Sequence, residues 1–182
     1  MRWSNLATDL EKLFKMAKDT VTHKKIVLDN CFLMAQYFMS NGKIELGTQL
    51  LKRGCEHDNS KFDKEEFRKL SQILKSNRCF TDADAQLTPT ERKAIEYHWE
   101  HNRHHPEYFS DYTEMSELDM LEMVCDWFAR SLQYGTDFLP FVEERQANRF
   151  HFEAKQYAKI HKYCVLIQEL YNNTKDTGGA EN

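Results

Sequence analysis

Glycine and proline are scarce in this sequence, which has only 6 Gly and 3 Pro among its 182 residues. An all-β domain needs these residues at many tight turns, so their scarcity argues against a sandwich or a barrel. Leu, Lys, Glu, Met and Gln, which favour helices, are common instead. We therefore expect an all-α protein with one domain over residues 1–172, large enough to bury its core without disulfides or a structural metal, and a disordered tail at 173–182.

Long apolar runs, basic runs and paired cysteines are also lacking. No apolar stretch of about 18 residues occurs, and the N-terminal MRWSNLATDLEKLF lacks the apolar core of a secretory signal, so we expect neither a transmembrane segment nor a membrane partner. The net charge of −4 without clustered Lys or Arg argues against bulk nucleic-acid binding but leaves small anionic ligands open. The cysteines are scattered and never spaced as CxxC, which predicts free packing thiols in a reducing compartment and hence the cytoplasm. They are Cys31, Cys55, Cys79, Cys125 and Cys164.

Apolar side chains recur every three or four residues along most of the chain, which is typical of amphipathic helices. This periodicity predicts helices over about residues 5–18, closing over the core, and over about 20–40, 44–54 and 116–134, with packing helices in the C-terminal third. A further helix passes through Phe67, Leu70 and Leu74, and another starts at Thr88-Pro89. Expected helix ends are Asn41-Gly42, Gly54 and Gly135, and expected capping boxes are Asp63 with Glu66 and Thr88 with Glu91. The polar stretch 76–87 is predicted to be a loop.

Half of the eight histidines lie in the run HWEHNRHH, at His98, His101, His104 and His105. Imidazole is the commonest metal ligand of proteins near neutral pH, so the cluster predicts a metal site. On a continuous helix His98, His101 and His105 would share one face. Pro106 disfavours helical geometry at the residue before it, so the last two histidines can leave the helix and turn independently.

Further ligand types precede and follow the histidine run. His23 lies on the inward face of the predicted helix 20–40, and the pair His57-Asp58 comes just after the helix that we expect to stop near Gly54. On the helix 116–134 a polar stripe runs between two apolar flanks, and it consists of Asp119, Glu122, Asp126 and Arg130. Buried carboxylates require partners, so this stripe predicts an interior site in which a metal ion is the partner.

The order His23, His57-Asp58 within HDNSK, the histidine run, and Asp126 resembles the HD superfamily of metal-dependent phosphohydrolases. HDNSK is similar to that family's HD-x-[GS]-K element, and residues 23–27 are similar to its first-helix signature. The segment HNRHHPE resembles the paired histidines of its two-metal branch, although the Gly-Tyr-Pro element of that branch is absent. The whole pattern is closest to an uncharacterised bacterial and phage HD-like branch. The resemblance spans about residues 20–135 and implies a helical bundle with a central metal-binding cavity.

The resemblance also implies roles for individual residues. A first divalent ion would be bound by His23, His57, Asp58 and Asp126. A second ion would be bound by His101, His104 and His105, with Asp58 bridging to it. Lys61 and Arg130, and thirdly Arg103, are candidates for contacts to a substrate phosphate. Glu122 is expected either to orient a ligating histidine or to share a proton with water, and His98 to pack beside Trp99 or support the site from outside the ligand set.

The sequence therefore predicts a metal-dependent phosphohydrolase that acts on a nucleotide or a similar small phosphorylated substrate through a metal-activated water. The ligand types suit one or two ions of Mn, Fe, Co, Ni or Zn. Two alternatives stay open: a di-iron HD-type oxygenase or oxidase, and a catalytically silent metal-binding sensor or partner-binding protein. The sequence does not select the base, the number of phosphates or the oligomeric state.

Overall fold

The computed structural model describes residues 3–73 and 88–178, and all regular secondary structure within these ranges is helical, which confirms the all-α prediction. The α-helices are α1 (Trp3–Ser40), α2 (Ile44–Glu56), α3 (Lys64–Ile73), α4 (Pro89–His101), α5 (Glu117–Tyr134), α6 (Phe138–Arg145) and α7 (Ala154–Gly178). Short 3-10 turns are η1 (Asn59–Phe62), η3 (Pro106–Tyr108) and η4 (Tyr112–Glu114), and a π-helical turn, η5 (Gln146–Phe150), follows α6. The predicted loop 76–87, with Cys79, lies outside the described residues.

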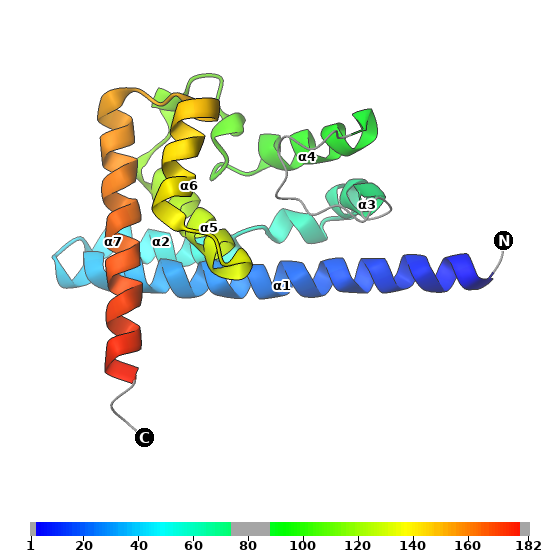
Figure 1. Ribbon diagram of the computed structural model, residues 1–182, viewed down its shortest axis with the longest axis horizontal. Coiled ribbons are helices and arrows are strands. Elements are labelled where there is room, and N and C mark those ends of the chain that lie inside the picture. The colour runs from blue at the N-terminus through cyan, green and yellow to red at the C-terminus, as the bar shows by residue number, and fades with distance from the viewer. Residues whose placement is uncertain (1–2, 74–87, 179–182) are drawn as a thin grey trace.

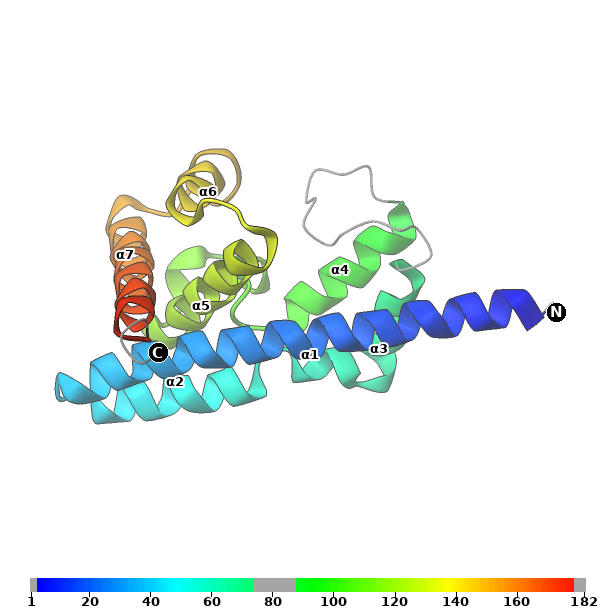
Figure 2. The same ribbon diagram turned by 60° about the horizontal axis from the view of Figure 1, so that its bottom comes forward.

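Helix α1 is the longest element of the molecule, with α2 antiparallel beside it, and α7 crosses it near the α2 end (Figure 1, Figure 2). The predicted break between residues 18 and 20 is wrong, because α1 runs without interruption from Trp3 to Ser40. Its N-terminal part extends beyond the rest of the bundle (Figure 2). Phe14 is 75% exposed there, whereas Met16 packs against Leu70 and Ala94, so this part of α1 does not close over the main core.

The contact between α1 and α2 depends on two glycines of α2. A Cβ at Gly47 would lie 2.8 Å from the carbonyl oxygen of Ala35, and a Cβ at Gly54 would lie 2.7 Å from Cβ of Cys31. We expected Gly54 to end its helix, but the helix continues to Glu56, and Gly54 instead permits close helix packing. This close approach brings His57 and Asp58, at the end of α2, next to the middle of α1.

Helix α5 is the central element and lies between α1, α2, α6 and α7 (Figure 2). It starts at a capping box of Ser116 with Asp119 and ends at Gly135, whose φ of 64° only glycine adopts easily, close to the predicted bounds. Every residue from Asp119 to Ala129 is buried. Three polar residues of the predicted stripe, Asp119, Glu122 and Asp126, therefore lie inside the bundle.

Helix α7 packs across α1 and α5 and continues to Gly178, so the tail predicted from residue 173 is helical up to that point. Residues 179–182 lie outside the described part of the chain. Cys31, Cys125 and Cys164 are buried with free thiols, as expected of packing residues, whereas Cys55 is exposed. No helix in the described ranges has both the length and the apolarity needed to cross a bilayer.

Candidate metal centre

The histidine run straddles the end of α4, and this break in the helix decides which imidazoles meet. The capping box of Thr88 and Glu91 starts α4 as predicted, and the helix ends at His101. His105 then adopts extended backbone (φ −90°, ψ 127°), as expected of a residue that precedes proline. His98 on the last turns of α4 and His104 and His105 on the following segment can therefore approach one point from different directions.

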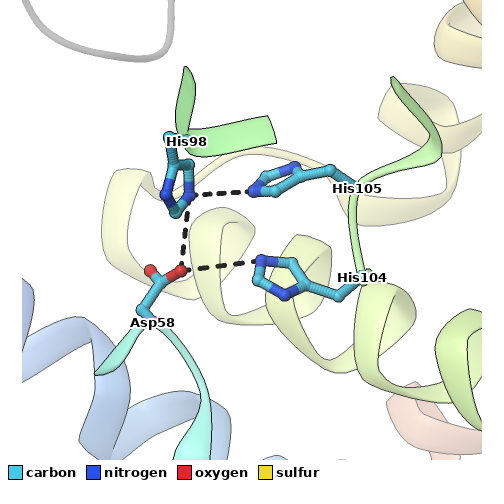
Figure 3. A group of neighbouring side chains, drawn as sticks. All are labelled: Asp58, His98, His104 and His105. Carbon is cyan, nitrogen blue, oxygen red and sulfur yellow. Dashed lines mark hydrogen bonds and ion pairs between the residues drawn. The ribbon is translucent and has the colours of Figure 1, made fainter. Parts of the chain in front are cut away.

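These three histidines and Asp58, which comes from the turn between α2 and η1, point toward a common centre (Figure 3). Oδ1 of Asp58 lies 3.4 Å from Nε2 of His98 and 3.6 Å from Nε2 of His104. The Nε2 atoms of His98 and His105 lie 3.0 Å apart. Ligand atoms placed about 2.1 Å from one ion are separated by about 3.0 Å in octahedral and about 3.4 Å in tetrahedral geometry, so this group has the spacing of a coordination shell.

A second group consists of His23, His57 and Asp126, from α1, the end of α2 and α5. Oδ1 of Asp126 lies 2.7 Å from Nε2 of His23 and 3.9 Å from Nε2 of His57. Oδ2 of Asp58 lies 3.6 Å from that same His57 nitrogen. Asp58 thus directs one oxygen toward each group, which is the arrangement of a carboxylate that bridges two ions.

The backbone of Asp58 explains how one residue reaches both groups. Its φ of 54° and ψ of 19° are left-handed, a conformation that Asp and Asn adopt more readily than most residues. The left-handed residue turns the chain sharply out of α2 and points the carboxylate into the bundle, where Asp58 is 2% exposed. Lys61, three residues later, places Nζ 2.6 Å from Oδ2.

Outer polar contacts fix the orientation of the imidazoles. Nδ1 of His98 lies 2.6 Å from Oε1 of Glu66, and Nδ1 of His57 lies 3.0 Å from Oε1 of Glu122. Because an ionised carboxylate only accepts hydrogen bonds, each Nδ1 donates a proton and each Nε2 presents a lone pair to the centre. Gln133 Oε1 likewise lies 2.7 Å from Nδ1 of His23.

One carboxylate supports a histidine of each group. Oε1 of Glu122, besides its contact with His57, lies 3.3 Å from Nδ1 of His104, and Oε2 lies 3.3 Å from Nε of Arg53. Burial would raise the pKa of Glu122, but its contacts with His104 and His57 outweigh burial and lower this pKa to about 2. Glu122 is therefore an ionised acceptor that orients histidines, one of the two roles predicted for it.

Several buried ligand atoms have no hydrogen-bond partner among the described residues. They are Nε2 of His57, Nε2 of His104 and Oδ1 of Asp58. A buried polar atom left in this way costs about 1–3 kcal/mol, so such atoms call for an explanation. Bound cations are one explanation: an ion among Asp58, His98, His104 and His105 would satisfy Oδ1 of Asp58 and Nε2 of His104, and an ion among His23, His57 and Asp126 would satisfy Nε2 of His57.

Most of the protonation states also suit metal binding. Burial would raise the pKa of Asp58, but Lys61 and the neighbouring imidazoles hold it well below its usual range. Burial likewise opposes ionisation of Asp126, yet the adjacent His23 imidazole and the Arg130 guanidinium hold its pKa well below the usual range. Burial lowers the pKa of His98 and of His105, which favours the neutral imidazoles that bind metals. His104 differs, because burial would lower its pKa but its contact with Glu122 outweighs burial and raises this pKa.

Two predicted site residues lie elsewhere. His101, predicted as a ligand, is exposed, and its Nδ1 donates to the carbonyl oxygen of Tyr97 one turn earlier in α4, 2.7 Å away. Its place in the ligand group is taken by His98, which we expected to lie outside the ligand set. Arg103, predicted to contact phosphate, instead pairs with Asp119 at 2.9 Å and covers the ring of Tyr108.

Three residues support the site although their sequence pattern did not predict it: Glu66, Arg53 and Gln133. Glu66 was assigned to a helix cap, but its side chain is 1% exposed and contacts His98. Its spacing could have revealed it, because Glu66 and Leu70 are one turn apart and belong to the same buried face of α3. No comparable signal marks Arg53, which reaches Asp119 and Glu122 across helices.

A cavity of about 450 Å³ opens beside the two groups and is lined by His98, His105 and Asp126. Lys61 and Arg130, the other predicted phosphate contacts, also line it. Arg130 lies one turn after Asp126 on α5, with Nε 3.7 Å from Oδ1 of that aspartate. The cavity therefore combines candidate metal ligands with cationic side chains on one wall.

Comparison with known proteins identifies the family of this chain but does not indicate an activity. Neither curated proteins nor solved structures yield a match to this chain. Residues 12–173, which include both ligand groups, match a protein family of unknown function. The chain belongs to this family, DUF5662.

Proposed function

We propose that the protein is an HD-type metal-dependent phosphohydrolase that cleaves a phosphate ester of a small, nucleotide-sized substrate with water. The observation that carries the proposal is that two groups of possible metal ligands adjoin at Asp58, which belongs to one and contacts His57 of the other, beside a cavity lined by Lys61 and Arg130. Cationic side chains next to a candidate metal centre favour an anionic substrate. The free thiols are consistent with a reducing compartment, and we propose that the protein acts in the cytoplasm.

The donor set fits divalent transition ions. Imidazole nitrogens together with carboxylate oxygens suit Mn, Fe, Co, Ni or Zn, and a site with three or four protein ligands leaves coordination positions open for water and substrate. His23, His57, Asp58 and Asp126 would hold one ion, and Asp58, His98, His104 and His105 would hold a second. When bound, such ions lower the pKa of water and withdraw charge from phosphoryl oxygens.

The protein's own residues would position the substrate for this chemistry. Lys61 and Arg130 line the cavity beside Asp58 and Asp126 and are placed to bind phosphoryl oxygens. In the hydrolysis, water contributes its oxygen to phosphorus, the P–O ester bond breaks, and the departing oxygen takes up a proton. Glu122 keeps its charge and holds His57 and His104 in place, so we assign it to positioning and not to proton transfer.

The test is a phosphate-release assay on protein that has been stripped of metal and reloaded with Mn²⁺, Fe²⁺, Co²⁺, Ni²⁺ or Zn²⁺. Substrates would be nucleoside mono-, di- and triphosphates and cyclic nucleotides. We expect ion-dependent hydrolysis that Asp126→Ala reduces by more than the roughly 10- to 100-fold typical of losing an outer contact. His101→Ala is the matched control and should retain activity, because His101 faces away from both groups.

Two outcomes would replace the proposal. Oxygen consumption by the iron-loaded protein, without phosphate release, would favour the di-iron oxygenase. Stoichiometric metal binding with neither activity would favour a sensor or partner-binding protein that keeps the centre.

A further inference from the structure

The cavity beside the metal centre has a second set of cationic side chains that the proposed reaction does not use. Arg145 and Arg149 line it, and they come from the end of α6 and from the π-helical turn η5. Short π-helical turns are rare and occur frequently at functional sites. Neither arginine contacts a candidate metal ligand in the ion pairs and ring contacts that the described residues make.

The surroundings of Arg149 leave it able to bind a ligand. Its guanidinium lies 5.0 Å from the ring centre of Trp99 and 5.1 Å from that of Phe150, and it contacts Oε1 of Glu107. A guanidinium has five N–H donors, and the contact with one carboxylate oxygen uses only part of them. Its side chain is 25% exposed, so the remaining donors are accessible from the cavity.

Arg145 is held in a similar way. Its guanidinium lies 5.0 Å from the ring centre of Phe141, and its Nε lies 3.6 Å from a carboxylate oxygen of Glu144, whose side chain is 49% exposed. An ion pair with a half-exposed carboxylate contributes little, so an anion in the cavity can compete for this guanidinium. Both arginines thus line the same cavity as Lys61 and Arg130 and can offer donors to an anion there.

Aromatic rings cover the cavity wall around these charges. Trp127 stacks on Phe150 with an interplanar angle of 15° and meets Phe141 edge-on at 89°, and all three line the cavity together with Trp99. Such walls favour a flat, polarisable ring, and guanidinium groups stacked on rings extend this flat surface. A cavity of about 450 Å³ is in the range that binds a ligand of this size.

We infer that Arg145 and Arg149 form a second anion subsite, and that the preferred ligand carries an aromatic ring system and two separate anionic groups. One phosphate would lie at the metal centre near Lys61 and Arg130, and the second anionic group would bind Arg145 and Arg149. This inference rests on the proposed function for the placement of the first phosphate. It narrows the substrate class from any small phosphate ester to a doubly phosphorylated compound of the nucleoside type.

Binding to the full chain tests the inference without requiring turnover. The probes are adenosine 3′,5′-bisphosphate, adenosine 5′-monophosphate and ribose 5-phosphate, measured by tryptophan fluorescence in chelator and again with Mn²⁺. Two of the chain's three tryptophans, Trp99 and Trp127, line the cavity and report on its occupancy. We expect the bisphosphate to bind about tenfold more tightly than the monophosphate, because charge-assisted hydrogen bonds to arginine are strong, and ribose 5-phosphate to bind most weakly.

Substitution separates the subsite from nonspecific charge attraction. In Arg145→Gln with Arg149→Gln the bisphosphate-to-monophosphate affinity ratio should fall to near one. Arg145→Gln alone, which loses the contact with half-exposed Glu144 and the ring contact with Phe141, should lower the ratio while the protein still unfolds cooperatively. Arg68→Gln, an arginine on the exposed side of α3, is the matched control and should keep the wild-type ratio.

Equal affinity of the wild type for both nucleotides, or an unchanged ratio in the variants, would overturn the subsite. A ratio that depends on Arg145 and Arg149 in a protein without hydrolytic activity would uphold the subsite and reject only the proposed reaction. Hydrolysis of monophosphates with no preference for the bisphosphate would support the proposed reaction and reject the subsite.

Discussion

Asp58→Asn is the most informative single substitution in this protein. Oδ1 of Asp58 faces His98 and His104 at 3.4 and 3.6 Å, and Oδ2 faces His57 at 3.6 Å, so this residue belongs to one ligand group and contacts the other. Asparagine tolerates the left-handed backbone at this position as aspartate does, so the variant changes the ligand and leaves the turn intact. It replaces a carboxylate oxygen with an amide nitrogen, which cannot bind a cation.

Two magnitudes can be estimated: the rise in Tm when metal binds the folded protein, and the stability that the metal-free variant loses at its contact with Lys61. A metal present at about 1,000 times its Kd stabilises the folded state by about 4.1 kcal/mol. In a domain of this size 1 kcal/mol shifts Tm by about 2–4 °C, so the wild type should gain about 8–16 °C for each ion bound at this excess. Without metal, the variant keeps a hydrogen bond from the Lys61 ammonium to a neutral amide oxygen in place of the ion pair at 2.6 Å, and should lose about 1–2 kcal/mol.

The assay is thermal unfolding with chelator and with Mn²⁺, Co²⁺ or Zn²⁺, for the wild type and for Asp58→Asn. The wild type should show the metal-dependent rise in Tm, and Asp58→Asn should show almost none while unfolding cooperatively. Asp29→Asn on the exposed side of α1 is the matched control, and it should respond to metal as the wild type does. A variant with the full wild-type rise would refute the assignment of Asp58 as the shared ligand.

Three further predictions concern other parts of the site and the fold. His98→Ala should lower metal stoichiometry by one ion per chain, whereas His101→Ala should leave it unchanged, as measured by elemental analysis after dialysis. Glu66→Gln should weaken the binding of one ion by about 10- to 100-fold in a competition titration, because Glu66 holds Nδ1 of His98. Met16→Ala should cost about 2 kcal/mol or more in urea unfolding, because Met16 is buried, whereas Phe14→Ser on the exposed face should change stability by about 0.5 kcal/mol or less.

Each of these predictions has a result that would count against it. Equal stoichiometry in the two histidine variants would mean that α4 contributes no ligand. Unchanged affinity in Glu66→Gln, with Glu65→Gln on the exposed side of the same helix as the comparison, would show that the carboxylate does not orient His98. If Phe14→Ser lowers the free energy of unfolding more than Met16→Ala does, the face of α1 that packs against the bundle is the one with Phe14 and not the one with Met16.

The helical class and the ligand order could be predicted because each depends on local signals. Capping residues and apolar periodicity locate α5 and the start of α4 within a few residues. His23 and Asp126 belong to buried helix faces that a 3.6-residue period identifies directly. In the structure His23 and Asp126 both lie next to His57, and the resemblance to the HD superfamily had implied this grouping.

The exchange of His101 for His98 could not be predicted, because it depends on tertiary contacts. Helical spacing places His98, His101 and His105 on one face, but α4 ends at His101 and the chain turns. Glu66, on a different helix, then fixes the imidazole of His98. The role of Gly54 was also hidden, because a glycine that ends a helix and one that permits close packing look alike in a single sequence.

The most direct test of the metal centre is titration of metal-stripped protein with Co²⁺, followed by visible absorption. If the side chains around Asp58 form two adjoining coordination sites, absorption should rise until two equivalents have bound, and Asp58→Asn should abolish most of it. A wild-type protein that develops no cobalt absorption, or that binds no ion after dialysis, would contradict the metal centre and the reaction proposed for it.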